Sequence, residues 1–182
     1  MKFKTGLPVF GIFGIKFKHN MIYWFIGQPG TGKSTLARML KEHFDGVNQP
    51  NIHLDGDDLR VIFGGSYKTE HFTKEYRDTN TRKLQAFVEY IEKQGIDVIV
   101  STVNGNRAIR EELKSRNPRV FEILVENSKP HVRDDRAYSD FEKPIDDFIV
   151  IDTGSHPNPQ SAFIQLCEKL KHWGLELYEK AN

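Results

Sequence analysis

Short apolar runs alternate along the chain with stretches in which apolar residues recur every three or four positions. Runs of the first kind are typical of buried parallel strands, and the periodic stretches are typical of amphipathic helices. The runs predict five strands, at residues 21–26, 51–55, 96–100, 120–125 and 147–151. The periodic stretches predict helices from about 32 to 46 and at 73–94, 106–115 and 159–173.

The apolar positions also predict which face of each helix is buried. In the helix at 73–94, four residues share one face: Leu84, Phe87, Val88 and Ile91. Pro159 is expected to open the last helix. Its inner face is predicted to carry Phe163, Leu166, Leu170 and Trp173, with Cys167 on the same stripe as a core residue.

Strands that alternate with helices form βαβ units, whose right-handed crossovers place parallel strands in one sheet with helices on both faces. We therefore expect an α/β fold with a five-stranded parallel sheet. One domain is expected over 21–175, preceded by an N-terminal extension at 1–20 that holds four lysines and no acid. The charged stretch at 126–147 lacks a clear pattern, which is typical of a working loop, and we expect a lid at about 128–144.

Residues 27–34, GQPGTGKS, match the pattern G-x-x-x-x-G-K-[ST] between the first strand and the first helix. Glycines let the backbone turn its N–H groups toward phosphate oxygens, and the helix start adds a positive dipole end. Lys33 is expected to reach the β- and γ-phosphates and Ser34 to hold Mg²⁺. A glycine-rich turn with a chance lysine is the alternative. The context favours a P-loop NTPase three-layer fold, with ATP bound by Gly30, Thr31, Gly32, Lys33, Ser34 and Thr35.

Composition and charge narrow the class of protein. Lysine and arginine total 26 and aspartate and glutamate 25, so the net charge of +1 argues against a nucleic-acid or membrane-surface partner. No apolar run approaches 18 residues, and the single cysteine excludes an intrachain disulfide, so we expect a cytoplasmic protein without membrane contact. The guanine-recognition pattern N-K-x-D is absent from the sequence. Among the proteins that carry such a phosphate loop, the remaining features favour a small kinase.

Acidic residues follow the second predicted strand directly, in the sequence Asp55-Gly56-Asp57-Asp58, with Arg60 close behind. We expect a turn here, in which Gly56 lets Asp57 point into the crevice at the carboxyl edge of the sheet. A carboxylate there is suited to binding Mg²⁺ or to accepting the proton of an acceptor hydroxyl, and Arg60 is suited to binding an anion. The alternative is a solvated turn in which Asp57 or Asp58 caps a helix.

These motifs together resemble the adenylylsulfate kinases, P-loop enzymes that phosphorylate adenosine 5′-phosphosulfate (APS) at its 3′-hydroxyl. The resemblance covers roughly residues 21–173. It rests on GQPGTGKSTLA, LDGDDLR, the stretch at 72–82, and FEKP at 141–144 followed by DFIVIDT at 147–153. It implies ATP and Mg²⁺ as cofactors and an anionic small-molecule acceptor, APS first, as the partner. A homodimer is left open.

The resemblance assigns roles on the acceptor side. Phe72 would stack on the acceptor adenine, Arg77 with Asn80 would bind the phosphosulfate or the ribose, and Arg60 would contact the same anion. Asp57 would be the catalytic carboxylate, working with Lys33. The alternatives stay open: Phe72 as a core anchor of the long helix, and Arg77 and Arg82 on a solvated face paired with Glu75 and Asp78.

Three further residues complete the implied site: Asn104 beside the acceptor, and Arg133 and Thr153 beside the nucleotide. The chain also departs from the family. The stretch at 101–106 lacks the proline of the family's I-S-P, and the lid lacks a lysine and the F-T-G-I-D segment. Arg133 and Arg136 can still supply positive charge to the transferring phosphoryl group. The acceptor therefore stays open between APS and another nucleotide, nucleoside, sugar or modified base, and a non-catalytic ATP-binding module is the second alternative.

Overall fold

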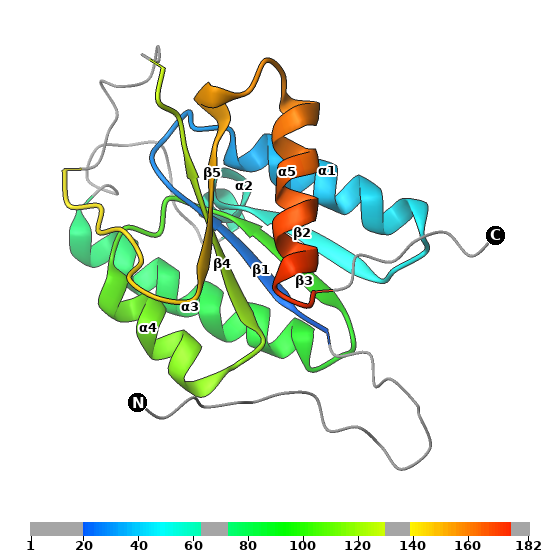
Figure 1. Cartoon of the computed structure of the whole chain (residues 1–182). Helices are drawn as coiled ribbons and strands as arrows, with labels where there is room; N and C mark the ends of the chain where they lie inside the picture. Colours follow the sequence, from blue (N-terminus) through cyan, green and yellow to red (C-terminus); the bar gives the residue numbers. More distant parts are fainter. Residues whose placement is uncertain (1–19, 63–72, 130–138, 176–182) are drawn as a thin grey trace, which may run out of the picture.

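The computed structural model describes residues 20–62, 73–129 and 139–175, which fold around one parallel sheet (Figure 1). Its strands are β1 Ile22–Ile26, β2 Asn51–Asp55, β3 Asp97–Ser101, β4 Val120–Glu126 and β5 Phe148–Asp152. They lie in the order β2-β3-β1-β4-β5, and all the neighbouring pairs are parallel. The predicted α/β fold of the P-loop type with a five-stranded parallel sheet is confirmed.

The helices of the described residues connect these strands. They are α1 Lys33–Gly46, α2 Gly56–Ile62, α3 Lys74–Glu92, α4 Arg107–Arg116 and α5 Pro159–His172, with a 3₁₀ turn at Thr153–Ser155. Three of them begin after a side chain that accepts a hydrogen bond from a first-turn amide, namely Thr73 before α3, Asn106 before α4 and Asn158 before α5. Such caps satisfy amides that have no partner inside the helix.

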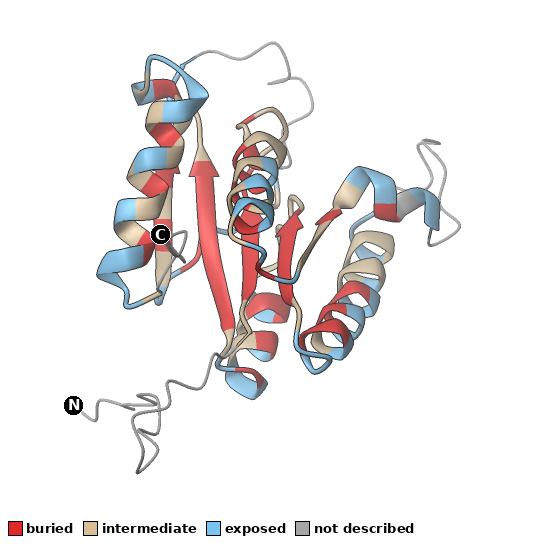
Figure 2. Cartoon of the chain, turned by 90° about the vertical axis from the view of Figure 1, so that its right-hand side faces the viewer, coloured by how far each residue is buried: buried red, intermediate tan, exposed pale blue. Residues whose placement is uncertain are grey.

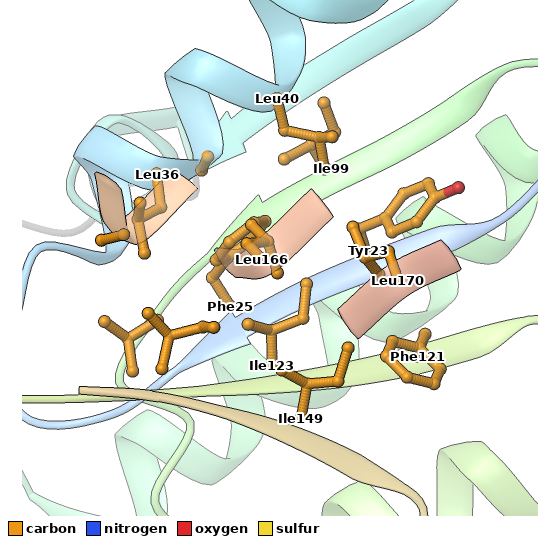
Figure 3. Close-up of a cluster of buried hydrophobic side chains, with 14 of the residues drawn as sticks. Tyr23, Phe25, Leu36, Leu40, Ile99, Phe121, Ile123, Ile149, Leu166 and Leu170 are labelled. Atoms are coloured by element: carbon orange, nitrogen blue, oxygen red, sulfur yellow. The ribbon is translucent and has the colours of Figure 1, made fainter. Parts of the chain in front are cut away.

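The sheet is buried on both faces. On one face, α1 and α5 pack against odd-numbered strand residues such as Phe25 and Ile123, with Leu36 and Leu166 in the same cluster (Figure 3). On the other face, α3 and α4 cover a second cluster that includes Trp24. Figure 2 shows the central strands buried over their whole length. Because both faces are covered, only the edge at the carboxyl ends of the strands is left to build a site.

The structure corrects three local predictions. The expected turn after β2 is the start of α2, which begins at Gly56. Phe87, predicted on the buried face of α3, is 42% exposed. The buried residues of α3 centre on a direction midway between Leu84 and Glu92. With 100° of rotation per residue, Phe87 points about 100° away from that direction. Trp173 follows the last residue of α5 and is 47% exposed, although its ring meets the edge of Phe121.

None of the helices in the described ranges is long and apolar enough to cross a membrane. Cys167 is half-buried against the α1–α5 cluster, and burial raises the pKa of its thiol to about 11. A thiol held protonated in this way is a packing group, as its place on the helix stripe predicts.

Candidate active site

The loop between β1 and α1 has the backbone shape that the glycine pattern predicts. Gly27, Gly30 and Gly32 all have positive φ angles. A Cβ atom at Gly27 would lie 2.2 Å from the carbonyl oxygen of Val125, so only glycine fits there. Because α1 begins at Lys33, directly after the loop, the positive end of the helix dipole lies at the loop. Phosphate binding here stays a prediction, and the loop geometry supports it.

Lys33 bends back over this loop. Its side chain is buried, and its Nζ donates to the carbonyl oxygen of Gln28 at 2.5 Å. The hydroxyl of Thr31 donates to the same carbonyl at 3.0 Å. The ammonium group therefore lies inside the loop, where the predicted phosphates would meet it.

Thr153 braces the loop from the end of β5. Its hydroxyl lies 2.9 Å from the carbonyl oxygen of Thr31 and 3.1 Å from that of Glu126, and its single proton is shared between them. Its methyl group would lie 3.2 Å from a Cβ on Gly32. The residue predicted to contact the nucleotide thus holds the backbone of the phosphate loop. A direct contact of Thr153 with the nucleotide stays a prediction.

Asp55 is a site residue that the sequence reading missed. Its Oδ2 accepts hydrogen bonds from Ser34 at 2.5 Å and from Ser101 at 2.7 Å, and its Oδ1 accepts from the backbone N–H of Asp57 at 3.0 Å. Burial by itself would raise the pKa of Asp55, but the hydrogen bonds from Ser34, the Asp57 amide and Ser101 together hold it below the ordinary value. The signal that could have found Asp55 is its position. It is the last residue of β2, and the neighbouring strand β3 ends at Ser101, directly beside it.

Asp57 lies apart from this hydrogen-bonded group. Its side chain is exposed in the first turn of α2, and only its backbone N–H reaches Asp55. Asp57 as catalytic carboxylate and metal ligand remains a prediction. Arg60 lies in the same helix, and its side chain falls outside the described residues.

The residues present suit a magnesium ion bound together with phosphate. Ser34 offers a hydroxyl oxygen and Asp55 a carboxylate oxygen, and Mg²⁺ prefers oxygen ligands in small number, completed by substrate phosphates and water. Among the described residues, no group of three or more histidine, cysteine, aspartate or glutamate side chains could hold a metal alone. This chemistry fits a metal that arrives with ATP.

Two of the predicted acceptor residues, Arg77 and Asn80, lie on α3. Arg77 forms an ion pair with Asp140, and Arg82 forms one with Glu112. Both arginines are therefore paired with acids of other segments. Asn80 is partly buried on the same helix. The predicted contributions of Phe72, Arg133 and Arg136 lie outside the described residues.

Asn104 follows β3 and has an unusual backbone. Its φ is +45°, and its side chain is buried, with an Oδ1 that has no hydrogen-bond partner in the described structure. Its carbonyl oxygen accepts from Arg110 at 2.6 Å. A buried acceptor without a donor is costly, so it marks a place where a donor group of a ligand would be favourable. The prediction of Asn104 on the acceptor side is compatible with this geometry.

Arg110 was not foreseen from the sequence. It is 1% exposed and lies 2.9 Å from Glu122, which is 2% exposed. Besides Asn104, it donates to the carbonyl oxygen of Glu142 at 2.6 Å, and its guanidinium lies over the ring of Phe141. This one side chain joins Glu122 of β4 to the segments that hold Asn104 and Glu142.

Comparison with known proteins agrees with the motifs. A family model described as adenylylsulphate kinase matches residues 19–143. The chain is 35% identical over 109 residues to the adenylyl-sulfate kinase of Chloroflexus aurantiacus, an alignment that covers 60% of this chain and 57% of the relative. The chain thus spans little more than half the length of such curated relatives.

Solved structures share the fold. The Mycobacterium tuberculosis APS kinase in complex with AMPPNP and APS has a TM-score of 0.67 and 17% identity, over 84% of this chain and 98% of that one. A sugar kinase from Janibacter sp. HTCC2649 has a TM-score of 0.58 and 16% identity, over 90% of this chain and 99% of that one. At these identities the likeness shows a common architecture and leaves the acceptor open.

Proposed function

Since this chain belongs to the adenylylsulphate kinase family, we propose that it transfers the γ-phosphoryl group of ATP to the 3′-hydroxyl of APS, forming 3′-phosphoadenosine 5′-phosphosulfate. The observation that carries the proposal is the hydrogen bond between Ser34 of the phosphate loop and Asp55 of the neighbouring strand end. It joins the family's two leading motifs in one site.

On the nucleotide side, the proposed work of the chain is binding and charge neutralisation. Phosphoryl transfer has a loose transition state, so positioning and electrostatic stabilisation supply most of the catalysis. Loop amides and the first turn of α1 would hold the phosphates, and Lys33 would turn from the Gln28 carbonyl to the γ-phosphoryl oxygens. Thr153 would keep the loop in shape.

Ser34 and Asp55 would hold the magnesium ion, which, when bound, neutralises charge on the β- and γ-phosphoryl oxygens. Asp55 suits this task because its pKa is already below the ordinary value, so the carboxylate is ionised at neutral pH. Both of its oxygens accept hydrogen bonds, which fixes the orientation of the group before ATP binds.

On the acceptor side, Asp57 would orient the acceptor hydroxyl and accept its proton. The acceptor would enter between α2 and α3, where Arg60, Arg77 and Asn80 are expected to bind its anionic and ribose groups. The unpartnered Oδ1 of Asn104 would accept a hydrogen bond from an acceptor hydroxyl or amino group. Phe72 would stack on the acceptor base, and Arg133 would add positive charge beside the phosphates.

One observation favours a second candidate, a kinase of the same chemistry for a less anionic acceptor. Arg77 is paired with Asp140, which lowers the positive charge on offer to a phosphosulfate. The shorter lid of this sequence points the same way. A nucleoside or sugar hydroxyl would need less positive charge at this position than APS.

The deciding experiment is an acceptor panel with the full chain, ATP and Mg²⁺. ADP release is measured with APS, a nucleotide, a nucleoside and a hexose, and the products are separated by chromatography. We expect release that depends on APS, and its loss in Lys33→Ala but not in the exposed control Lys41→Ala. Release with a different acceptor would replace APS and keep the kinase. ATP binding without release for any acceptor would identify a nucleotide-binding module instead.

A further inference from the structure

A chain of hydrogen bonds runs from the phosphate loop to a histidine on β2. Ser34 donates to Asp55 at 2.5 Å, Ser101 donates to the same Oδ2 at 2.7 Å, and Nε2 of His53 lies 2.9 Å from the Ser101 hydroxyl. The sheet register explains the arrangement, because Asp55 pairs with Ser101 across β2 and β3. His53 lies two residues before Asp55 and therefore on the same face of the strand.

The direction of each hydrogen bond follows from the number of protons available. Ser101 has one hydroxyl proton, and an ionised carboxylate is a stronger acceptor than a neutral imidazole. The proton therefore goes to Asp55, and the lone pairs of Ser101 are left to accept from Nε2–H of His53. Both the neutral Nε2–H tautomer and the protonated ring can make this contact, so it does not depend on titration of the histidine.

We propose that His53 is a positioning residue of the kinase site, which orients Asp55 toward Ser34 by holding the hydroxyl of Ser101. The proposal rests on the function proposed above, since it concerns the same Asp55–Ser34 pair. None of the motifs that carry the family resemblance includes position 53, since the nearest of them, LDGDDLR, begins at Leu54. Without the histidine, the Ser101 hydroxyl is free to rotate away, and Asp55 loses one of the three donors that set its orientation.

The kinetic test separates positioning from packing. His53→Leu keeps a side chain of similar size and removes the N–H donor. We expect its kcat to fall by about 3–10-fold, which is the loss typical of one hydrogen bond. The KM for the acceptor should stay unchanged. His53→Gln places an N–H at similar reach and should return kcat to within about 2-fold of the wild type. Ile52→Val is the matched control, since Ile52 lies on the opposite face of β2 and packs in the other cluster.

A double variant tests the route through Ser101. If His53 acts only through that hydroxyl, His53→Leu added to Ser101→Ala lowers kcat no further than Ser101→Ala alone. A second full loss in the double variant would overturn the proposal. A His53→Leu variant with the kcat of the wild type would also overturn it. The same holds if Ile52→Val and His53→Leu lose the same melting temperature and their kcat values fall equally.

Two readouts do not need turnover. Nitrogen-15 correlation spectra of the imidazole rings, with the His53 signals assigned by their absence in His53→Gln, should show the Nε2–H tautomer, and Ser101→Ala should change these signals. Calorimetry with AMPPNP should show weaker binding of His53→Leu in the presence of Mg²⁺ and equal binding in its absence. An Nδ1–H tautomer, or equal binding under both conditions, would refute the role of His53. A wild-type chain that binds AMPPNP but phosphorylates no acceptor would instead overturn the proposed function.

Discussion

Arg110 supports the sharpest prediction on stability, and the perturbation is Arg110→Met. The variant keeps the length of the side chain and removes its charge and donors. Among the described residues, only Lys114, at 3.2 Å, would then remain as a close cation of Glu122. The carbonyl groups of Asn104 and Glu142 would each lose a donor at 2.6 Å.

The magnitude follows from burial. Arg110 and Glu122 are 1% and 2% exposed, so solvent screens their interaction very little. Removing one partner of such a pair typically lowers the free energy of unfolding by about 3–5 kcal/mol, because the other charge stays buried with one cation fewer to compensate it. For a domain of this size, that corresponds to a fall in melting temperature on the order of 10 °C.

The double variant Arg110→Met with Glu122→Leu separates charge from packing. It removes both charges, while Lys114 keeps Glu111 at 2.8 Å and the carbonyl oxygen of Asp146 at 3.1 Å. Urea unfolding should therefore find the double variant more stable than Arg110→Met by about 2 kcal/mol or more, since a well-packed apolar pair often replaces a buried ion pair at little loss. The reasoning is refuted if Arg110→Met unfolds within about 1 kcal/mol of the wild type, which is the range of an exposed pair.

Three further predictions concern the proposed reaction. Lys33→Ala should lower kcat/KM by at least about 10²-fold, as expected for a lost electrostatic clamp, and near-normal turnover would remove Lys33 from the mechanism. Asp57→Asn should abolish turnover while the Kd for ATP, measured by calorimetry, changes far less; an unaltered rate would exclude Asp57 as the proton acceptor. Asp140→Asn should remove the ion pair of Arg77 with Asp140 and lower the KM for APS about 3–10-fold, as for one surface-accessible charge contact, with Asp146→Asn as the exposed control; an unchanged KM would show that this ion pair does not limit acceptor binding.

Strands and phosphate loop were predictable because they follow from local pattern. A run such as Ile22–Ile26 is buried wherever it lies in a parallel sheet, and the glycine pattern needs only the strand before it and the helix after it. Asp55 was missed because its role depends on register. Only the pairing of β2 with β3 and the packing of α1 bring Ser101 and Ser34 to the same carboxylate oxygen, and neither is readable from spacing along the chain.

Arg110 shows the same limit from the opposite direction. In the sequence it is one charge among several on a polar helix, RAIREELKSR, and an arginine in such a helix is expected to be exposed. Its burial requires Glu122, an acid in the middle of a buried strand, to face α4 from β4. A charged residue inside an apolar strand run is the one local signal that could have pointed to such a partner, because isolated buried charges are rare.

The two acids around Gly56 occupy positions with different freedom, and that difference fits the two tasks proposed for them. Asp55 ends a strand and is held by hydrogen bonds to both of its oxygens. Gly56 allows the close approach that follows, since a Cβ there would lie 3.0 Å from the methyl group of Thr102 and 3.3 Å from the carbonyl oxygen of Ser101. Asp57 comes next, exposed on the first turn of a short helix. A group that holds a metal and phosphates benefits from a fixed orientation before binding, whereas a group that accepts a proton has to reach an acceptor that arrives later. The single glycine between them lets one short segment serve both requirements.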